Sequence, residues 1–309
     1  MNTPQVKTRT NSVRRATSSV HRAAFTLVEL MVVILIIGIL VGIATPVIFR
    51  AMAASKELTV INEVQQMNAA TEAFKTKYGF YPPAFGPGLE IDTSNSAAGV
   101  AAFNRYLTRI APNHAEVSSG GLLAWWTNVG INLDERSSLV FWLSGLCTSK
   151  QFPLSGSGAL VTAGSSLAPY NANVLLDDVT TPGATIDRNV FYEFNNGQLT
   201  SLLDPTGAPI VPGIKGYNQA QGKGEGDALA FHYRDFKSYA AGASPAYHYQ
   251  DPTTGAVTFL NPTSVQIVGP GLDGVLAEQP NTNLVGSSDP TQDDNITNFS
   301  NGRLEKSFE

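Results

Sequence analysis

The sequence contains little cysteine, little histidine and little charge. Of its 309 residues, 1 is cysteine, 4 are histidine and 15% are charged. A single cysteine, Cys147, excludes an intrachain disulfide, and its apolar neighbours predict a buried thiol. His114, His232 and His248 have no metal-ligand spacing with one another, and no Gly-x-Ser-x-Gly or His-Glu-x-x-His motif occurs. Nothing in these patterns indicates an enzyme.

Acidic residues are absent from the start of the chain and in excess after it. Residues 1–24 carry five basic residues and no acid, within a chain of formal charge −5. Without residues 1–24, the chain has 15 basic and 25 acidic residues, which gives a formal charge of −10. This acidic balance excludes nucleic acid as an expected partner, because duplex binding requires Lys and Arg to neutralise phosphates.

A long segment without any charge follows the basic leader. It runs for 20 residues from Leu30 to Phe49, and at about 1.5 Å per helical residue it covers about 30 Å, one bilayer core. The positive-inside rule keeps the basic leader cytoplasmic and places the rest of the chain outside the inner membrane. Pro46 removes a helical hydrogen bond, which predicts a kink or a melted turn; alternatively, it marks the membrane exit.

The apolar run contains one acid near its start, Glu29, in the segment Phe25-Thr26-Leu27-Val28-Glu29-Leu30-Met31. A carboxylate in hydrocarbon is unfavourable and needs a partner, so it indicates a functional site. An ordinary secretory signal is cut after its apolar region, whereas here the small residues Ala23-Ala24 precede it. A cut after Ala24 leaves the apolar helix on the mature protein. The alternative is an uncut signal anchor.

The segment 24–34, Ala-Phe-Thr-Leu-Val-Glu-Leu-Met-Val-Val-Ile, resembles the class III signal of type IV prepilins and type II secretion pseudopilins. The resemblance implies that a prepilin peptidase cuts between Ala24 and Phe25 and methylates the new amine of Phe25. Ala24 replaces the Gly that usually precedes the cut. The resemblance further implies that Glu29 is an assembly residue, and that the partners are copies of the chain, other pseudopilins and an inner-membrane secretion platform.

Apolar residues continue beyond the membrane segment at spacings of three and four as far as Tyr78. This pattern predicts one helix of about 53 residues, apolar all round in its first half and amphipathic in its second. Gly79 and Pro82-Pro83 are typical of a helix end. The second half is therefore predicted to pack on a globular domain. The expected buried stripe is Leu58, Ile61, Val64, Met67 or Asn68, Thr71, Phe74 and Tyr78.

The rest of the chain predicts an α+β fold, in which the long helix packs on an antiparallel β-sheet with a large insertion. In the resembled family this layout is the type IV pilin lollipop. We expect a short helix at 101–110 and one or two core helices within 122–148. The expected strands are 190–194, 199–203, 228–234, 246–249 and 265–268, with Asn195-Asn196-Gly197 as a hairpin turn between the first two.

The predicted domains are a leader (1–24), a transmembrane half-helix (25–49), an amphipathic half-helix (50–78) and an outer domain (79–309). Within the outer domain, an insertion (84–225) precedes the sheet and the C-terminal loop (226–309).

The C-terminal block carries a second resemblance. The turn Gly271-Leu272-Asp273-Gly274 and the segment 293–299, Asp-Asp-Asn-Ile-Thr-Asn-Phe, are similar to the end of major, G-type type II pseudopilins. That resemblance implies a calcium site with Asp293, Asp294 and Asn295 as ligands, and these residues offer the oxygens that calcium takes. Asn295 stands where the family usually has an acid. The alternative is a solvated Asp/Asn loop with no ion.

Together these patterns predict a structural subunit of a type II secretion pseudopilus that supports protein export. It would be a single-pass inner-membrane protein, N-terminus cytoplasmic and outer domain periplasmic, that assembles into a periplasmic filament. One alternative is a type IV pilin for adhesion, motility or DNA uptake. Another is a membrane-tethered binding module with a groove lined by Trp125, Trp126 or Trp142.

Overall fold

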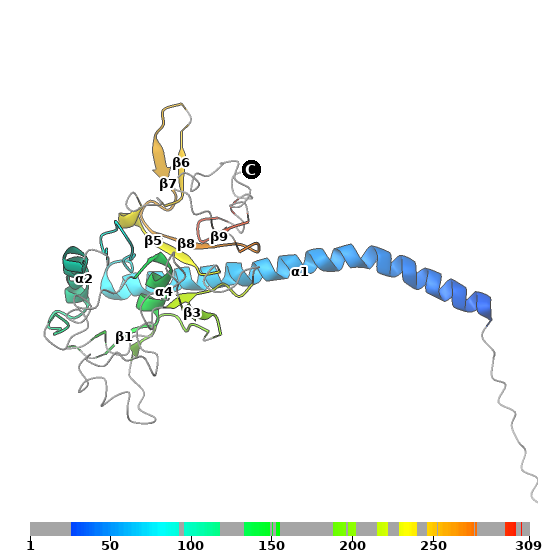
Figure 1. Cartoon of the computed structure of the whole chain (residues 1–309), viewed down its shortest axis with the longest axis horizontal. Helices are drawn as coiled ribbons and strands as arrows, with labels where there is room; N and C mark the ends of the chain where they lie inside the picture. Colours follow the sequence, from blue (N-terminus) through cyan, green and yellow to red (C-terminus); the bar gives the residue numbers. More distant parts are fainter. Residues whose placement is uncertain are drawn as a thin grey trace, which may run out of the picture. The chain divides into compact units, whose positions relative to one another are not determined.

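The chain divides into two compact units, Met1–Ala51 and Met52–Glu309. A computed structural model (Figure 1) shows the second unit as a helix surrounded by small antiparallel sheets and short helices. The residues that the structure describes are 26–92, 96–117, 133–148, 150, 153–154, 188–195, 197–201, 215–221, 229–239, 246–251, 253–274, 276, 294–300 and 304.

Helix α1 runs from Leu27 to Tyr78, 52 residues, which confirms the predicted long helix. It ends at Gly79, whose φ of 81° is the left-handed conformation expected of a C-terminal cap. Of the alternatives predicted at Pro46, the melted turn is wrong, since the helix is unbroken there, while the kink and the membrane exit stay predictions. In an apolar surrounding a melted turn would leave several backbone groups unsatisfied, whereas proline removes only one hydrogen bond.

The second half of α1 is buried along one stripe, but the stripe starts later than predicted. Val60, Val64 and Met67 are buried, whereas Leu58 is 58% exposed. A residue two positions before Val60 lies roughly 160° away around the helix, so Leu58 faces solvent while the stripe faces the domain. The buried residues of the stripe are Val60, Val64, Met67, Ala70, Thr71 and Phe74.

The outer domain confirms the α+β class, because all strand pairs are antiparallel and they accompany the long helix. One sheet has three strands in the order β5-β8-β9, and the other pairs are β1-β2, β3-β4 and β6-β7. Besides α1, the helices among the described residues are α2 (Ser96–Ile110), α4 (Glu135–Leu143) and the 3-10 turn η1 (Phe236–Ser238). The strands are β1 (Leu146–Cys147), β2 (Arg188–Asn189), β3 (Leu199–Ser201), β4 (Lys215–Tyr217), β5 (His232–Asp235), β6 (His248–Gln250), β7 (Val257–Phe259), β8 (Val265–Gly269) and β9 (Ile296–Thr297).

Aromatic rings form the centre of the core beside α1. Phe74 lies in edge contact with Trp142, at a centroid distance of 5.9 Å, and Phe85 stacks on the same indole at 5.6 Å. The indole nitrogen of Trp142 donates to the carbonyl of Pro83 at 2.9 Å, so this buried polar group is satisfied. Trp142 is therefore a core residue and not part of an open groove. The predictions for Trp125, Trp126 and the Cys147 side chain fall outside the described parts.

The hairpin predicted around Asn195 is wrong. The turn itself forms, since the amide of Gln198 donates to the carbonyl of Asn195 at 2.9 Å, but the segments beside it do not pair. Instead β3 pairs with β4, and the amide of Phe191 donates to the carbonyl of Leu143 at 3.0 Å. The rings of 190–194 pack into the core, and this burial overrides their strand propensity.

A half-buried carboxylate also joins α1 to the loops around β3 and β4. Glu63 accepts hydrogen bonds from the side-chain amide of Gln198 at 2.7 Å and from the backbone of Ala220 at 3.0 Å. Burial has the larger effect and raises the pKa of Glu63, although the two hydrogen bonds act in the opposite direction and lower it. Among the described residues, the phenols of Tyr192 and Tyr217 interact with it electrostatically.

The position of the buried stripe on α1 predicts a large loss of stability for one apolar truncation and little change for another. Met67→Ala should lower the free energy of unfolding by about 2–5 kcal/mol, because it leaves a cavity in the core. Leu58→Ala should change it by about 0.5 kcal/mol or less, because the side chain is exposed. Urea denaturation of the two variants measures this difference, and equal losses would contradict the burial pattern.

The raised pKa of Glu63 predicts a pH dependence. The folded protein holds this proton more tightly than the unfolded chain, so the contribution of Glu63 to stability is fully present below the unfolded pKa, near 4.5, and is lost as pH rises through the folded pKa. Glu63→Gln removes this contribution. Denaturation series across pH for both proteins should show a smaller loss in the variant as pH rises above about 4.5. If the stability of the two proteins changed with pH in parallel, Glu63 would have the same pKa in the folded and unfolded states, which would contradict the prediction.

Candidate functional site: the N-terminal turn and the C-terminal loop

Glu29 closes a reciprocal set of hydrogen bonds with Thr26 at the start of α1. Its carboxylate oxygen Oε2 accepts from the backbone amide of Thr26 at 2.9 Å and from the threonine hydroxyl at 3.1 Å. In return, the amide of Glu29 donates to the hydroxyl oxygen of Thr26 at 3.2 Å. This arrangement is a capping box, which satisfies amides that have no partner within the helix. The sequence reasoning missed it, although the Thr-x-x-Glu spacing is its usual signal.

The capping box places the acid at the positive end of the helix dipole, where a carboxylate is stabilised. Both accepted bonds go to the same oxygen, Oε2. The oxygen Oε1 can therefore take a cationic partner without breaking the cap. Ala24 and Phe25, where cleavage and methylation are predicted, lie outside the described residues.

The helix that follows Glu29 exposes an apolar surface on all sides. Leu30, Ile36 and Val47 are 57%, 51% and 62% exposed, and α1 is long and apolar enough to cross a membrane, judged by length and composition. Such a surface exceeds by far the apolar patches of soluble monomers. It is compatible with lipid, or with other apolar helices packed beside it.

The predicted calcium ligands lie in the C-terminal loop, next to β9. Asp293 is outside the described residues. Oδ2 of Asp294 accepts from the amides of Leu272 and Asp273 at 2.8 and 3.0 Å, so this carboxylate caps the turn after β8. Asn295 is fully buried and donates to the hydroxyl of Tyr247 at 3.0 Å.

The described residues of this loop do not by themselves form a calcium site. Calcium takes about six to eight oxygen ligands. Oδ1 of Asn295 is buried and accepts no hydrogen bond from the described residues, so it is open to a cation. Oδ1 of Asp294 is buried in the same way, whereas Oδ2 of Asp294 accepts from two amides. In the parts of the chain that are described, no three His, Cys, Asp or Glu side chains gather at one place. Calcium at Asp293, Asp294 and Asn295 stays a prediction.

Residues 20–45 match the prokaryotic N-terminal methylation motif. No curated protein and no solved structure matches the chain. The motif covers the basic end of the leader, the predicted cut, Glu29 and most of the apolar run. This match supports a prepilin-like protein that is processed at this motif and assembles as a pilus or pseudopilus subunit, and α1 is consistent with an inner-membrane anchor.

The capping box predicts that Thr26 controls the order of the first helical turn. Thr26→Val removes the hydroxyl and weakens the cap by about 0.5–2 kcal/mol, whereas Thr26→Ser keeps it. Hydrogen exchange of the Glu29 amide, measured on the detergent-solubilised chain, should accelerate in Thr26→Val and stay close to wild type in Thr26→Ser. Equal exchange in the two variants would show that the hydroxyl does not cap the helix.

Proposed function

We propose that this prepilin-like chain is a structural subunit of a type II secretion pseudopilus and supports protein export. The N-terminal motif supports a filament subunit. The likeness of the C-terminal block to G-type pseudopilins and the acidic mature chain support the secretion branch. The chain itself contributes no catalytic residue in this function, and the force for assembly comes from a separate cytoplasmic ATPase.

The observation that carries the proposal is the carboxylate of Glu29 at the start of a helix whose apolar side chains are exposed. Prepilin peptidase removes the leader before Phe25 and methylates the new amine, which remains cationic. The subunit then stays in the inner membrane, held by α1, with its outer domain in the periplasm. Within a bundle of such helices, both the carboxylate and the amine need a partner of opposite charge.

Glu29 of one subunit pairs with the Phe25 amine of a neighbouring copy. The pair neutralises two charges in an apolar surrounding, where the loss of one partner costs about 3–5 kcal/mol. Because Oε2 holds the helix cap, Oε1 receives the amine while the first turn stays intact. The pairing also fixes the axial offset between neighbours, and repeated addition at the membrane pushes the filament outwards like a piston.

A type IV pilin for adhesion, motility or DNA uptake is the second candidate, because the methylation motif does not distinguish the two systems. The single cysteine weighs against it, since many classical pilins close a C-terminal loop by a disulfide. Genes for a secretion ATPase and an outer-membrane secretin beside this one would favour the pseudopilus. Their absence, with a retraction ATPase in their place, would favour the pilus.

Glu29→Leu tests the assembly role. The variant should insert into the membrane and be cleaved, since both steps depend on the leader and on the apolar run, but it should not assemble. N-terminal sequencing reports cleavage, and chemical crosslinking reports assembly as a ladder of oligomers. Glu57→Leu, the same change further along α1, is the control and should keep the ladder. A normal ladder from Glu29→Leu would refute the pairing.

A further inference from the structure

The hairpin that β6 and β7 form stands out from the rest of the outer domain (Figure 1). Its strands have three residues each and pair antiparallel, with Tyr249 opposite Thr258 in the middle. They form a sheet of two strands, so among the described residues no third strand pairs with either edge. A two-stranded hairpin is marginally stable in water unless other contacts hold it.

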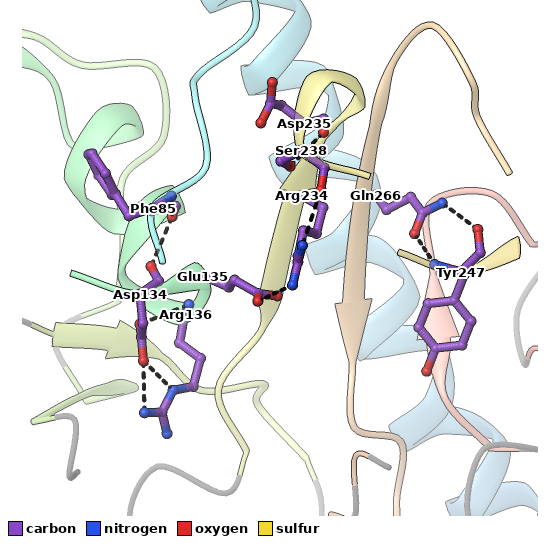
Figure 2. Close-up of polar contacts among 10 residues, drawn as sticks. Phe85, Asp134, Glu135, Arg136, Arg234, Asp235, Ser238, Tyr247 and Gln266 are labelled. Carbon is purple, nitrogen blue, oxygen red and sulfur yellow. Dashed lines mark hydrogen bonds and ion pairs between the residues drawn. The ribbon is translucent and has the colours of Figure 1, made fainter. Parts of the chain in front are cut away.

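A buried amide holds the base of this hairpin. The side chain of Gln266, on β8, accepts through Oε1 from the amide of Tyr247 at 2.8 Å, and its Nε2 donates to the carbonyl of Tyr247 at 2.9 Å (Figure 2). The same Nε2 donates to the carbonyl of Leu260 at 2.8 Å. Tyr247 precedes β6 and Leu260 follows β7, so one side chain fixes both strands where they join the domain.

The tip of the hairpin has hydrogen bonds of its own. The carboxylate of Asp251 accepts from the amides of Thr253 and Thr254 at 2.7 and 3.0 Å. The amide of Asp251 donates to the carbonyl of Ala256 at 2.9 Å. Because both the base and the tip are fixed within the chain, the hairpin loses little conformational freedom when it binds a partner, and this favours association.

Between the base and the tip, the hairpin exposes apolar side chains. Tyr249 is 50% exposed and Val257 is 48% exposed. Tyr249 pairs with Thr258, one position beyond Val257, so strand alternation places the two side chains on opposite faces of the hairpin. Soluble proteins protect open strand edges with charged side chains, above all lysine. Neither β6 nor β7 has a Lys, Arg, Asp or Glu, so the hairpin lacks this protection.

The charge of the chain indicates which partner such a surface fits. Asp251 is the only Lys, Arg, Asp or Glu from 238 to 272, in a chain of which 15% is charged. Without its leader the chain has a formal charge of −10, so the acidic surfaces of two copies repel each other. Like charges that face each other across an interface are strongly unfavourable. An uncharged, partly apolar surface is therefore where a second copy of this acidic chain can make contact.

We propose that the β6–β7 hairpin is a contact arm, which packs on the outer domain of a neighbouring copy through Tyr249 and Val257. Assembly through α1 holds the outer domains of neighbouring copies near one another and so raises their effective concentration. The contact arm adds a contact between outer domains to the contact between helices. The inference rests on the assembly of copies, and it is the same for a pseudopilus and for a pilus.

A photo-crosslinker in place of Tyr249 tests which molecule the contact arm touches. The full chain with p-benzoylphenylalanine at this position is irradiated in the membranes of cells that assemble it, and chemical crosslinking of the same sample reports assembly as a ladder. The proposal predicts an adduct of twice the subunit mass, in which mass spectrometry finds only this chain. In the Glu29→Leu background the adduct should disappear together with the ladder.

The two readouts separate the contact arm from the proposed function. A ladder without the adduct, or an adduct only with another protein, would overturn the contact arm and leave the filament role intact. If the chain that retains Glu29 gave neither a ladder nor an adduct, both assembly and the contact arm would be refuted.

Added acids test the apolar surface itself. Tyr249→Glu and Val257→Glu, combined, should lower the yield of oligomers about tenfold, because they place acids against an acidic neighbour, and high salt should restore part of the yield. The Tm should stay close to that of wild type, since both positions are exposed. Val117→Glu, the same change at a valine that is 53% exposed outside the hairpin, is the control and should keep the yield. A full yield from the double variant would refute the contact arm.

Discussion

The structure depends on one constraint: the first half of α1 is apolar on every side, yet it carries a carboxylate. In the described residues of this part of the chain the apolar side chains are exposed, so lipid or neighbouring helices must cover them. The carboxylate then lies in a surrounding where a charge needs an opposite charge. Thr26 stabilises the acid through one oxygen, and the other remains for a cation. A membrane anchor with these properties is also an assembly element.

The second half of the same helix has the opposite task, because it holds the outer domain. Phe74 and its neighbours supply the apolar contact, while Glu63 and Asn68 supply polar contacts from the two sides of the stripe. The polar contacts reach segments that lie far away in sequence, near β3, β4 and β9. The helix therefore holds the domain through specific hydrogen bonds as well as through the apolar core.

Local signals predicted the helices well, whereas long-range pairing escaped them. The end of α1 at Gly79, the helix at 101–110 and the strands within 228–234 and 265–268 follow from periodicity and caps, and the structure contains them. The hairpin at Asn195 failed because burial of Phe191 and its neighbours decides the path there. The buried stripe of α1 begins at Val60 and not at Leu58, because the contact with the outer domain decides where burial begins, and the helical periodicity alone does not show this. The role of Gln266 could not be predicted, because its partner Tyr247 is distant in sequence.

The central claim is that Glu29 of one copy contacts the Phe25 amine of another. Solid-state NMR tests this claim on filaments that are assembled from a mixture of two subunit preparations. One preparation is labelled with ¹⁵N at phenylalanine and the other with ¹³C at glutamate. The account predicts a short-range transfer from the Phe25 amine to the Glu29 carboxylate between differently labelled copies, and its loss in filaments that contain Glu29→Gln. No transfer between the two labels in well-formed mixed filaments would contradict the account.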